Sequence, residues 1–91
     1  MLTEIEVDNE VSADYTVIDI YTQDRLGVLY AITTTLAALG LDVYFSKVGT
    51  EADRVADVFY VRDKETGEKI TGEERLAQIS RALEDALGAL A

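Results

Sequence analysis

The segment from Thr22 to Leu29 (Thr-Gln-Asp-Arg-Leu-Gly-Val-Leu) contains the residue types best able to form a small-molecule site. It follows an apolar run rich in β-branched and aromatic residues, and it precedes apolar residues at helical spacing. A strand that enters a helix through a glycine leaves the first helical N–H groups without partners, and such groups attract anions. The segment therefore predicts a site for an anion such as the carboxylate of an amino acid.

Six residues of this segment are considered for ligand binding: Asp24, Arg25, Leu26, Gly27, Val28 and Leu29. The backbone N–H groups of the last four are the main candidates for the anion, because a helix N-terminus carries partial positive charge. Asp24 has two open interpretations, as the N-cap of the helix or as the acceptor of a ligand's α-amino group. Arg25 is either solvated or a further contact for the carboxylate. Gly27 either allows close packing of the helix on the sheet or belongs to a ligand loop.

The composition restricts the function further. The chain has 91 residues, the size of a single domain (1–91), with 8 basic and 18 acidic residues and a net charge of -10. Nucleic acids and anionic membranes would repel it, so we expect neither as a partner. It has no Cys and no His, which removes the usual zinc ligands, thiol nucleophiles and proton shuttles. We expect no catalytic residue, metal or cofactor, and a cytoplasmic location.

The apolar patterns predict two strands, a helix, two more strands and a second helix. The expected strands cover residues 2–7, 15–22, 41–49 and 54–62, with a polar turn at 50–53, and the helices cover about 26–39 and about 71 to the end. In the third strand the apolar residues change parity, which indicates a bulge.

Each helix carries an apolar stripe and expected end signals. Asp24 is the expected N-cap of the first helix, unless it binds a ligand, and Gly40 is its expected stop. The second helix is expected to begin with a capping box of Thr71 and Glu74. The stripe of the first helix is Leu29, Ile32, Leu36 and Leu39. The stripe of the second is Leu76, Ile79, Leu83, Leu87 and Leu90.

This order of elements predicts an α+β fold, a two-layer ferredoxin-like sandwich with a four-stranded antiparallel sheet and both helices on one face. The chain ends on a helix, so the N-terminal strand is expected to take the edge position that the last strand usually holds. The open sheet face is expected to expose residues such as Val17, Tyr21 and Phe59, and to associate with another surface.

Acidic residues outside the loop have two interpretations each. Asp19 and Asp57, on strands expected to be neighbours, are either exposed on the open face or share a partner's Arg. Residues 1–19 hold six acids and no base, which indicates either a solvated edge or a docking surface for a basic partner.

Two stretches carry a resemblance to a known family. They are residues 15–30, which contain Asp24-Arg-Leu-Gly27 between a strand and a helix, and the later strand Ala56-Asp-Val-Phe-Tyr-Val61. Together they resemble an ACT domain, a regulatory module that senses amino acids. The resemblance covers nearly the whole chain. It is strongest to the carboxy-terminal ACT repeat of the bifunctional uridylyltransferases and uridylyl-removing enzymes that modify PII signalling proteins.

The resemblance implies a sensor rather than an enzyme, because the catalytic regions of those proteins lie outside the matching residues. It implies pairing into a homodimer or with a neighbouring ACT domain, and binding of a small amino acid, glutamine in the uridylyltransferases, where the glycine loop meets a neighbouring domain. In the family the position of Leu26 is commonly Pro. The alternative is a ligand-free dimerisation or docking module of the same fold.

Overall fold

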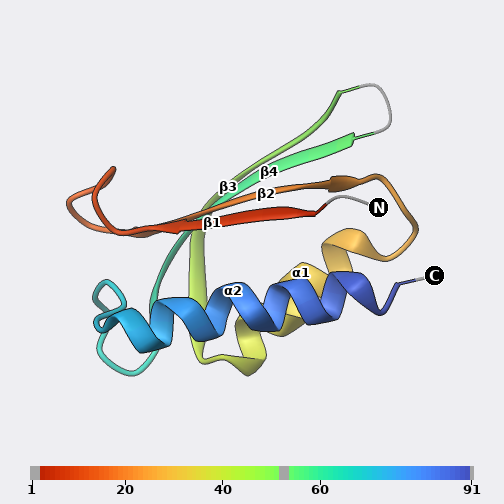
Figure 1. Cartoon of the computed structure of the whole chain (residues 1–91). Helices are drawn as coiled ribbons and strands as arrows, with labels where there is room; N and C mark the ends of the chain where they lie inside the picture. The colour runs from red at the N-terminus through yellow and green to blue at the C-terminus, as the bar shows by residue number, and fades with distance from the viewer. Residues whose placement is uncertain (1–2, 52–53, 91) are drawn as a thin grey trace.

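The computed structural model describes residues 3–51 and 54–90, which form two layers (Figure 1). The sheet contains β1 (Glu4–Asp8), β2 (Thr16–Gln23), β3 (Leu41–Glu51) and β4 (Arg54–Asp63). The helices are α1 (Val28–Ala38) and α2 (Glu73–Gly88), and both cover the same face of the sheet. Leu2 and residues 52–53, which we expected in a strand and a turn, lie outside the described residues.

The strand order is β1-β2-β4-β3, and every pair is antiparallel. The expected ferredoxin-like arrangement is therefore confirmed, with β1 at the edge beside β2. The expected bulge is also present, because the register of β3 against β4 shifts between Val43 and Phe45. The strand continues to Glu51, two residues beyond its expected end at Gly49, so residues 50 and 51 belong to the strand and not to the expected turn.

The core lies between the sheet and the helices. Ile18 and Ile20 of β2 face it, and α2 contributes its expected stripe, with Ile79, Leu83 and Leu87 fully buried. In α1 the buried residues are Val28, Ile32 and Leu36. Leu29 was expected in this stripe but is 48% exposed, because the buried face runs through Val28, Ile32 and Leu36 at a spacing of four residues and Leu29 lies beside that line.

Both expected helix caps are wrong. Gly27 is the N-cap of α1 and Gly72 the N-cap of α2, each with positive φ (87° and 91°) and without a side-chain hydrogen bond. Asp24 and Thr71 do not cap the helices, because a glycine stands between each of them and the first helical residue, and Glu74 lies within the first turn of α2. Gly40 ends α1 as expected, with a φ of 75° and its N–H bonded to the Ala37 carbonyl at 3.0 Å.

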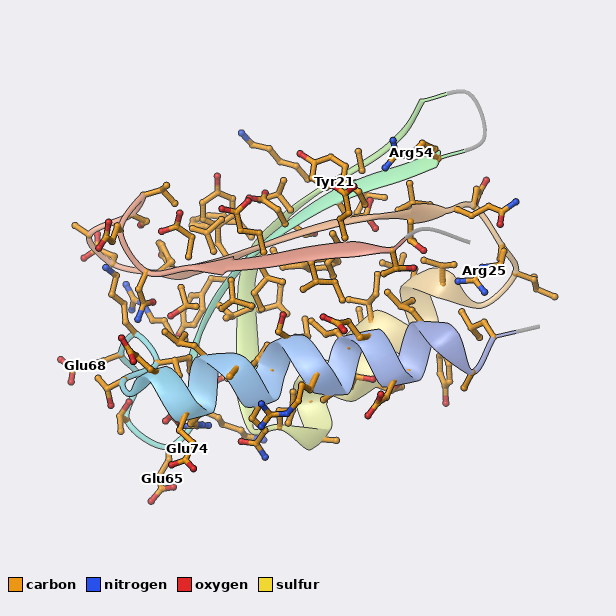
Figure 2. All side chains as sticks on the ribbon, viewed as in Figure 1. Tyr21, Arg25, Arg54, Glu65, Glu68 and Glu74 are labelled. Carbon is orange, nitrogen blue, oxygen red and sulfur yellow. The ribbon has the colours of Figure 1, made fainter. Side chains whose placement is uncertain are left out.

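The open sheet face differs from the expectation at two of three residues. Tyr21 is 41% exposed there, and Figure 2 shows it with Arg54 on the side away from the helices. Phe59 pairs with Ile18 and belongs to the core, and Val17 is buried although its parity puts it on the open face. Instead, a cluster of aromatic rings with centroids 5.3 to 6.2 Å apart lies where β2 begins and β4 ends: Tyr15, Tyr44, Phe45 and Tyr60.

Candidate functional site

The loop between β2 and α1 forms a tight turn at its end. The Val28 N–H binds the Arg25 carbonyl at 3.3 Å, and Gly27 has φ 87° and ψ 0°. These angles are those of the third residue of a type II turn, a position that favours glycine. A Cβ on Gly27 would lie 3.7 Å from Leu90, an ordinary contact distance, so backbone conformation and not close packing accounts for this glycine.

The start of α1 has no side-chain cap, because its N-cap residue is Gly27. The Ala31 N–H binds the Gly27 carbonyl at 2.9 Å, and no described side chain caps the helix. Within residues 3–51 and 54–90, the N–H groups of Leu29 and Tyr30 form no hydrogen bond. Free N–H groups at the positive end of a helix are a favourable position for a carboxylate.

A cleft of about 660 Å³ opens beside this helix end, between the loop and the β3–β4 hairpin. This volume is in the range of small-molecule sites. The cleft is lined by all six residues considered from the sequence and by Tyr30, Val48, Gly49, Val55 and Asp57.

Asp57 lies in this cleft and not on the open face, so its expected position is wrong. It is 2% exposed, and its Oδ1 accepts the Gly49 N–H at 3.3 Å. Burial raises the pKa of this carboxyl; the Gly49 hydrogen bond opposes the rise, and the nearby charge of Asp24 adds to it. Sequence reasoning missed Asp57 as a cleft residue, and the only available signal was an acid within an otherwise apolar strand.

Arg25 holds two parts of the chain together. Its guanidinium donates to the carbonyls of Leu90 at 2.9 Å and Leu87 at 3.1 Å, at the C-terminal end of α2, and Figure 2 shows the side chain between the loop and this end. It is half-buried rather than solvated, and its Nε is buried without a partner among the described residues. Arg25 thus lines the cleft while anchoring the loop to α2.

The remaining loop residues are exposed. Leu26 is 99% exposed and Leu29 is 48% exposed, so both present apolar surface at the rim of the cleft. Asp24 is exposed near Asp57. In the described part of the chain, no three acids gather closely enough to hold a metal ion. No described helix is both long and apolar enough to cross a membrane.

Comparison with known proteins identifies the family. The model of the ACR9-like, ACT-like domain matches residues 4–89. The chain belongs to the ACT-like domain family. The resemblance seen in the sequence is therefore confirmed, and the chain is an ACT-like regulatory domain.

Curated relatives of this ACT-like domain carry the name bifunctional uridylyltransferase/uridylyl-removing enzyme. Those of Rhodospirillum rubrum and Rhodopseudomonas palustris are each 44% identical, over 81 and 80 residues, and that of Azospirillum brasilense is 42% identical over 81 residues. These matches cover 88 to 89% of the chain, which spans only 8 to 9% of the relatives' length. They concern a small part of each relative.

A solved structure supports the fold independently. The crystal structure of an unknown protein from Galdieria sulphuraria matches 86% of this chain and 41% of that protein, with a TM-score of 0.64 and 20% sequence identity. At this identity the likeness concerns the fold alone.

Proposed function

We propose that this domain senses a free amino acid, glutamine in the first instance, and regulates a uridylyltransferase-type enzyme of nitrogen signalling. The observation that carries the proposal is the cleft at the uncapped start of α1, lined by all six residues of the loop. The Leu29 and Tyr30 N–H groups receive the ligand carboxylate. The relatives' name supports the type of parent enzyme. A cytoplasmic location is part of the same proposal.

The shape of the cleft supports a site completed by a second domain. It is open to solvent, and apolar side chains surround it without covering it: Leu26, Leu29, Tyr30 and Val48 are 48 to 99% exposed. A second copy of the domain, or a neighbouring ACT domain, would cover these side chains and close the ligand off from water.

Isothermal titration calorimetry with glutamine tests the proposal, with glutamate and asparagine as comparison ligands. We expect saturable heat with glutamine at millimolar concentration or below, together with a rise in Tm. Absence of heat and of a thermal shift with every amino acid at millimolar concentration would contradict amino acid sensing. It would favour the second candidate, a ligand-free docking module, which the exposed aromatic side chains Tyr44 and Phe45 support.

A pair of glycine substitutions separates binding from stability. Gly27 and Gly67 both have positive φ, 87° and 73°, and a methyl group at either meets no close neighbour. Replacing either with Ala strains the backbone and lowers stability by roughly 1 kcal/mol. Gly27→Ala is expected to weaken glutamine binding as well, because it moves the turn that frees the helix N–H groups, whereas Gly67→Ala leaves binding unchanged.

A further inference from the structure

Asp57 is an ionisable group that the fold does not explain. It occupies the helix-facing side of β4, between Val55 and Phe59 of the apolar core, and it is 2% exposed. Burial of a carboxylate is unfavourable unless a cation or several hydrogen bonds compensate for lost water. Asp57 receives one such bond, from the Gly49 N–H at 3.3 Å.

Within residues 3–51 and 54–90, no side-chain cation forms an ion pair with this carboxylate. Among the described side chains, the single ion pair joins Arg75 to Asp63, on the far side of the core from the cleft. The charged group that acts on Asp57 is Asp24, which has the same sign. The other carboxylate oxygen of Asp57 forms no hydrogen bond within the described residues, and Asp57 lines the cleft.

The cleft therefore offers two complementary groups to one small molecule. On one wall are the free N–H groups of Leu29 and Tyr30 at the start of α1, and on the other wall is Asp57 of β4. The first attracts a carboxylate and the second attracts an ammonium group. A free α-amino acid carries both groups on one carbon atom.

We propose that Asp57 receives the α-ammonium group of the ligand, so that the cleft selects amino acids with a free amino group. This inference rests on the proposed amino acid sensing and adds the residue that sets its selectivity. Asp24, exposed at the rim, adds negative potential that favours the ammonium group. We assign the direct contact to Asp57 rather than to Asp24, because a buried carboxylate forms stronger charge-assisted bonds than a solvated one.

The test compares glutamine with 4-carbamoylbutanoate, which is glutamine without its amino group, by calorimetry. The wild-type domain is expected to bind the deaminated compound roughly tenfold or more weakly than glutamine. Asp57→Asn keeps an acceptor for the Gly49 N–H and removes the charge. It is expected to bind the two compounds with equal affinity, and its Tm is expected to stay the same or rise at neutral pH. Asp19→Asn, a control on the open face of β2, is expected to retain the preference for glutamine.

The outcomes are distinct. Binding of glutamine that does not depend on its amino group in the wild-type domain, or a preserved preference in Asp57→Asn, would overturn the role of Asp57 and leave amino acid sensing standing. Binding of no amino acid by the wild-type domain would overturn both.

Discussion

At the scale of single residues, the turn before α1 shows that a proline would fit at position 26. The sequence has Leu26 where the family commonly has Pro, and the structure puts Leu26 in the second position of a type II turn, with Gly27 in the third. Proline has the φ that the second position requires. The Leu26 N–H has no hydrogen bond within the described residues, so a proline, which lacks this N–H, would remove no interaction.

Leu26→Pro is therefore expected to raise the free energy of unfolding by about 0.4 to 1 kcal/mol, because proline restricts the unfolded chain. Urea denaturation measures the change. Leu26→Ala serves as the control, with a near-zero effect expected because the side chain is 99% exposed. A destabilised proline variant would show that the turn is not of type II.

Asp63 and Arg75 predict a dependence of stability on pH. Arg75 donates to the Asp63 carboxylate, and this bond is the main reason that the pKa of Asp63 lies below its ordinary value, with the Glu65 N–H contributing at 2.9 Å. A lowered pKa in the folded state means that the stabilisation is complete above the ordinary carboxyl pKa, about 3.9, and is lost as the pH falls through the folded value.

Denaturation of the wild-type domain and of Arg75→Met, measured from pH 6 down to a pH below the carboxyl pKa, is expected to reveal how much the Asp63–Arg75 pair contributes to stability. The variant is less stable at pH 6, and its stability changes less on acidification. Parallel curves for the two proteins would contradict the assignment. Arg81→Met, which replaces an exposed arginine of the same helix, is expected to follow the wild type.

At the scale of elements, the order and type of strands and helices followed from periodicity, because β-branched runs and apolar stripes were clear. The helix starts could not be predicted from periodicity. Gly27 and Gly72, both with positive φ, are the N-caps, whereas Asp and Thr are the residues that commonly occupy this position. The sequence also did not predict which face of β4 points toward the helices. Both parities carry large apolar groups, so packing on β2 and the helices decided that Phe59 and Asp57 face inward.

The candidate site divides in the same way. The loop could be predicted from the sequence, because a glycine between an expected strand and an expected helix is a pattern of only a few adjacent residues. Asp57 is more than 25 residues along the chain from that loop, and only the β2–β4 register brings it to the cleft. The bonds from Arg25 to Leu87 and Leu90 join residues 62 and 65 positions apart, so local sequence patterns could not predict them.

Arg25→Met is expected to loosen the last turn of α2. The substitution removes two charged hydrogen bonds to the carbonyls of Leu87 and Leu90 while keeping part of the apolar stem, and it is expected to lower the free energy of unfolding by about 1 to 3 kcal/mol. Hydrogen exchange is expected to accelerate at residues 87–90 in particular. Unchanged exchange there would contradict the anchoring role.

At the scale of the whole molecule, the open sheet face predicts association. Phe45 and Tyr44 are 56% and 45% exposed, and the Arg62 guanidinium lies 4.4 Å from the Tyr15 ring centre and 4.8 Å from that of Tyr44. An aromatic patch of this kind, uncovered by either helix, is typical of an interaction surface.

Sedimentation equilibrium is expected to show self-association of the wild-type domain, and Phe45→Lys is expected to weaken it by roughly tenfold or more. Val11→Lys provides the control, because Val11 is 68% exposed but lies in the connection between β1 and β2. A wild-type domain that stays monomeric, or equal association of both variants, would contradict use of this face between copies of the chain.

The central claim is that one cleft holds an amino acid between the start of α1 and the β3–β4 hairpin. Titration of glutamine into isotope-labelled domain, followed by amide chemical shifts in NMR, tests it most directly. We expect the largest shifts at residues 27–30 and at Gly49 and Asp57, with the Leu29 and Tyr30 amides moving most. Shifts confined to the open sheet face, or none at saturating glutamine, would contradict the claim.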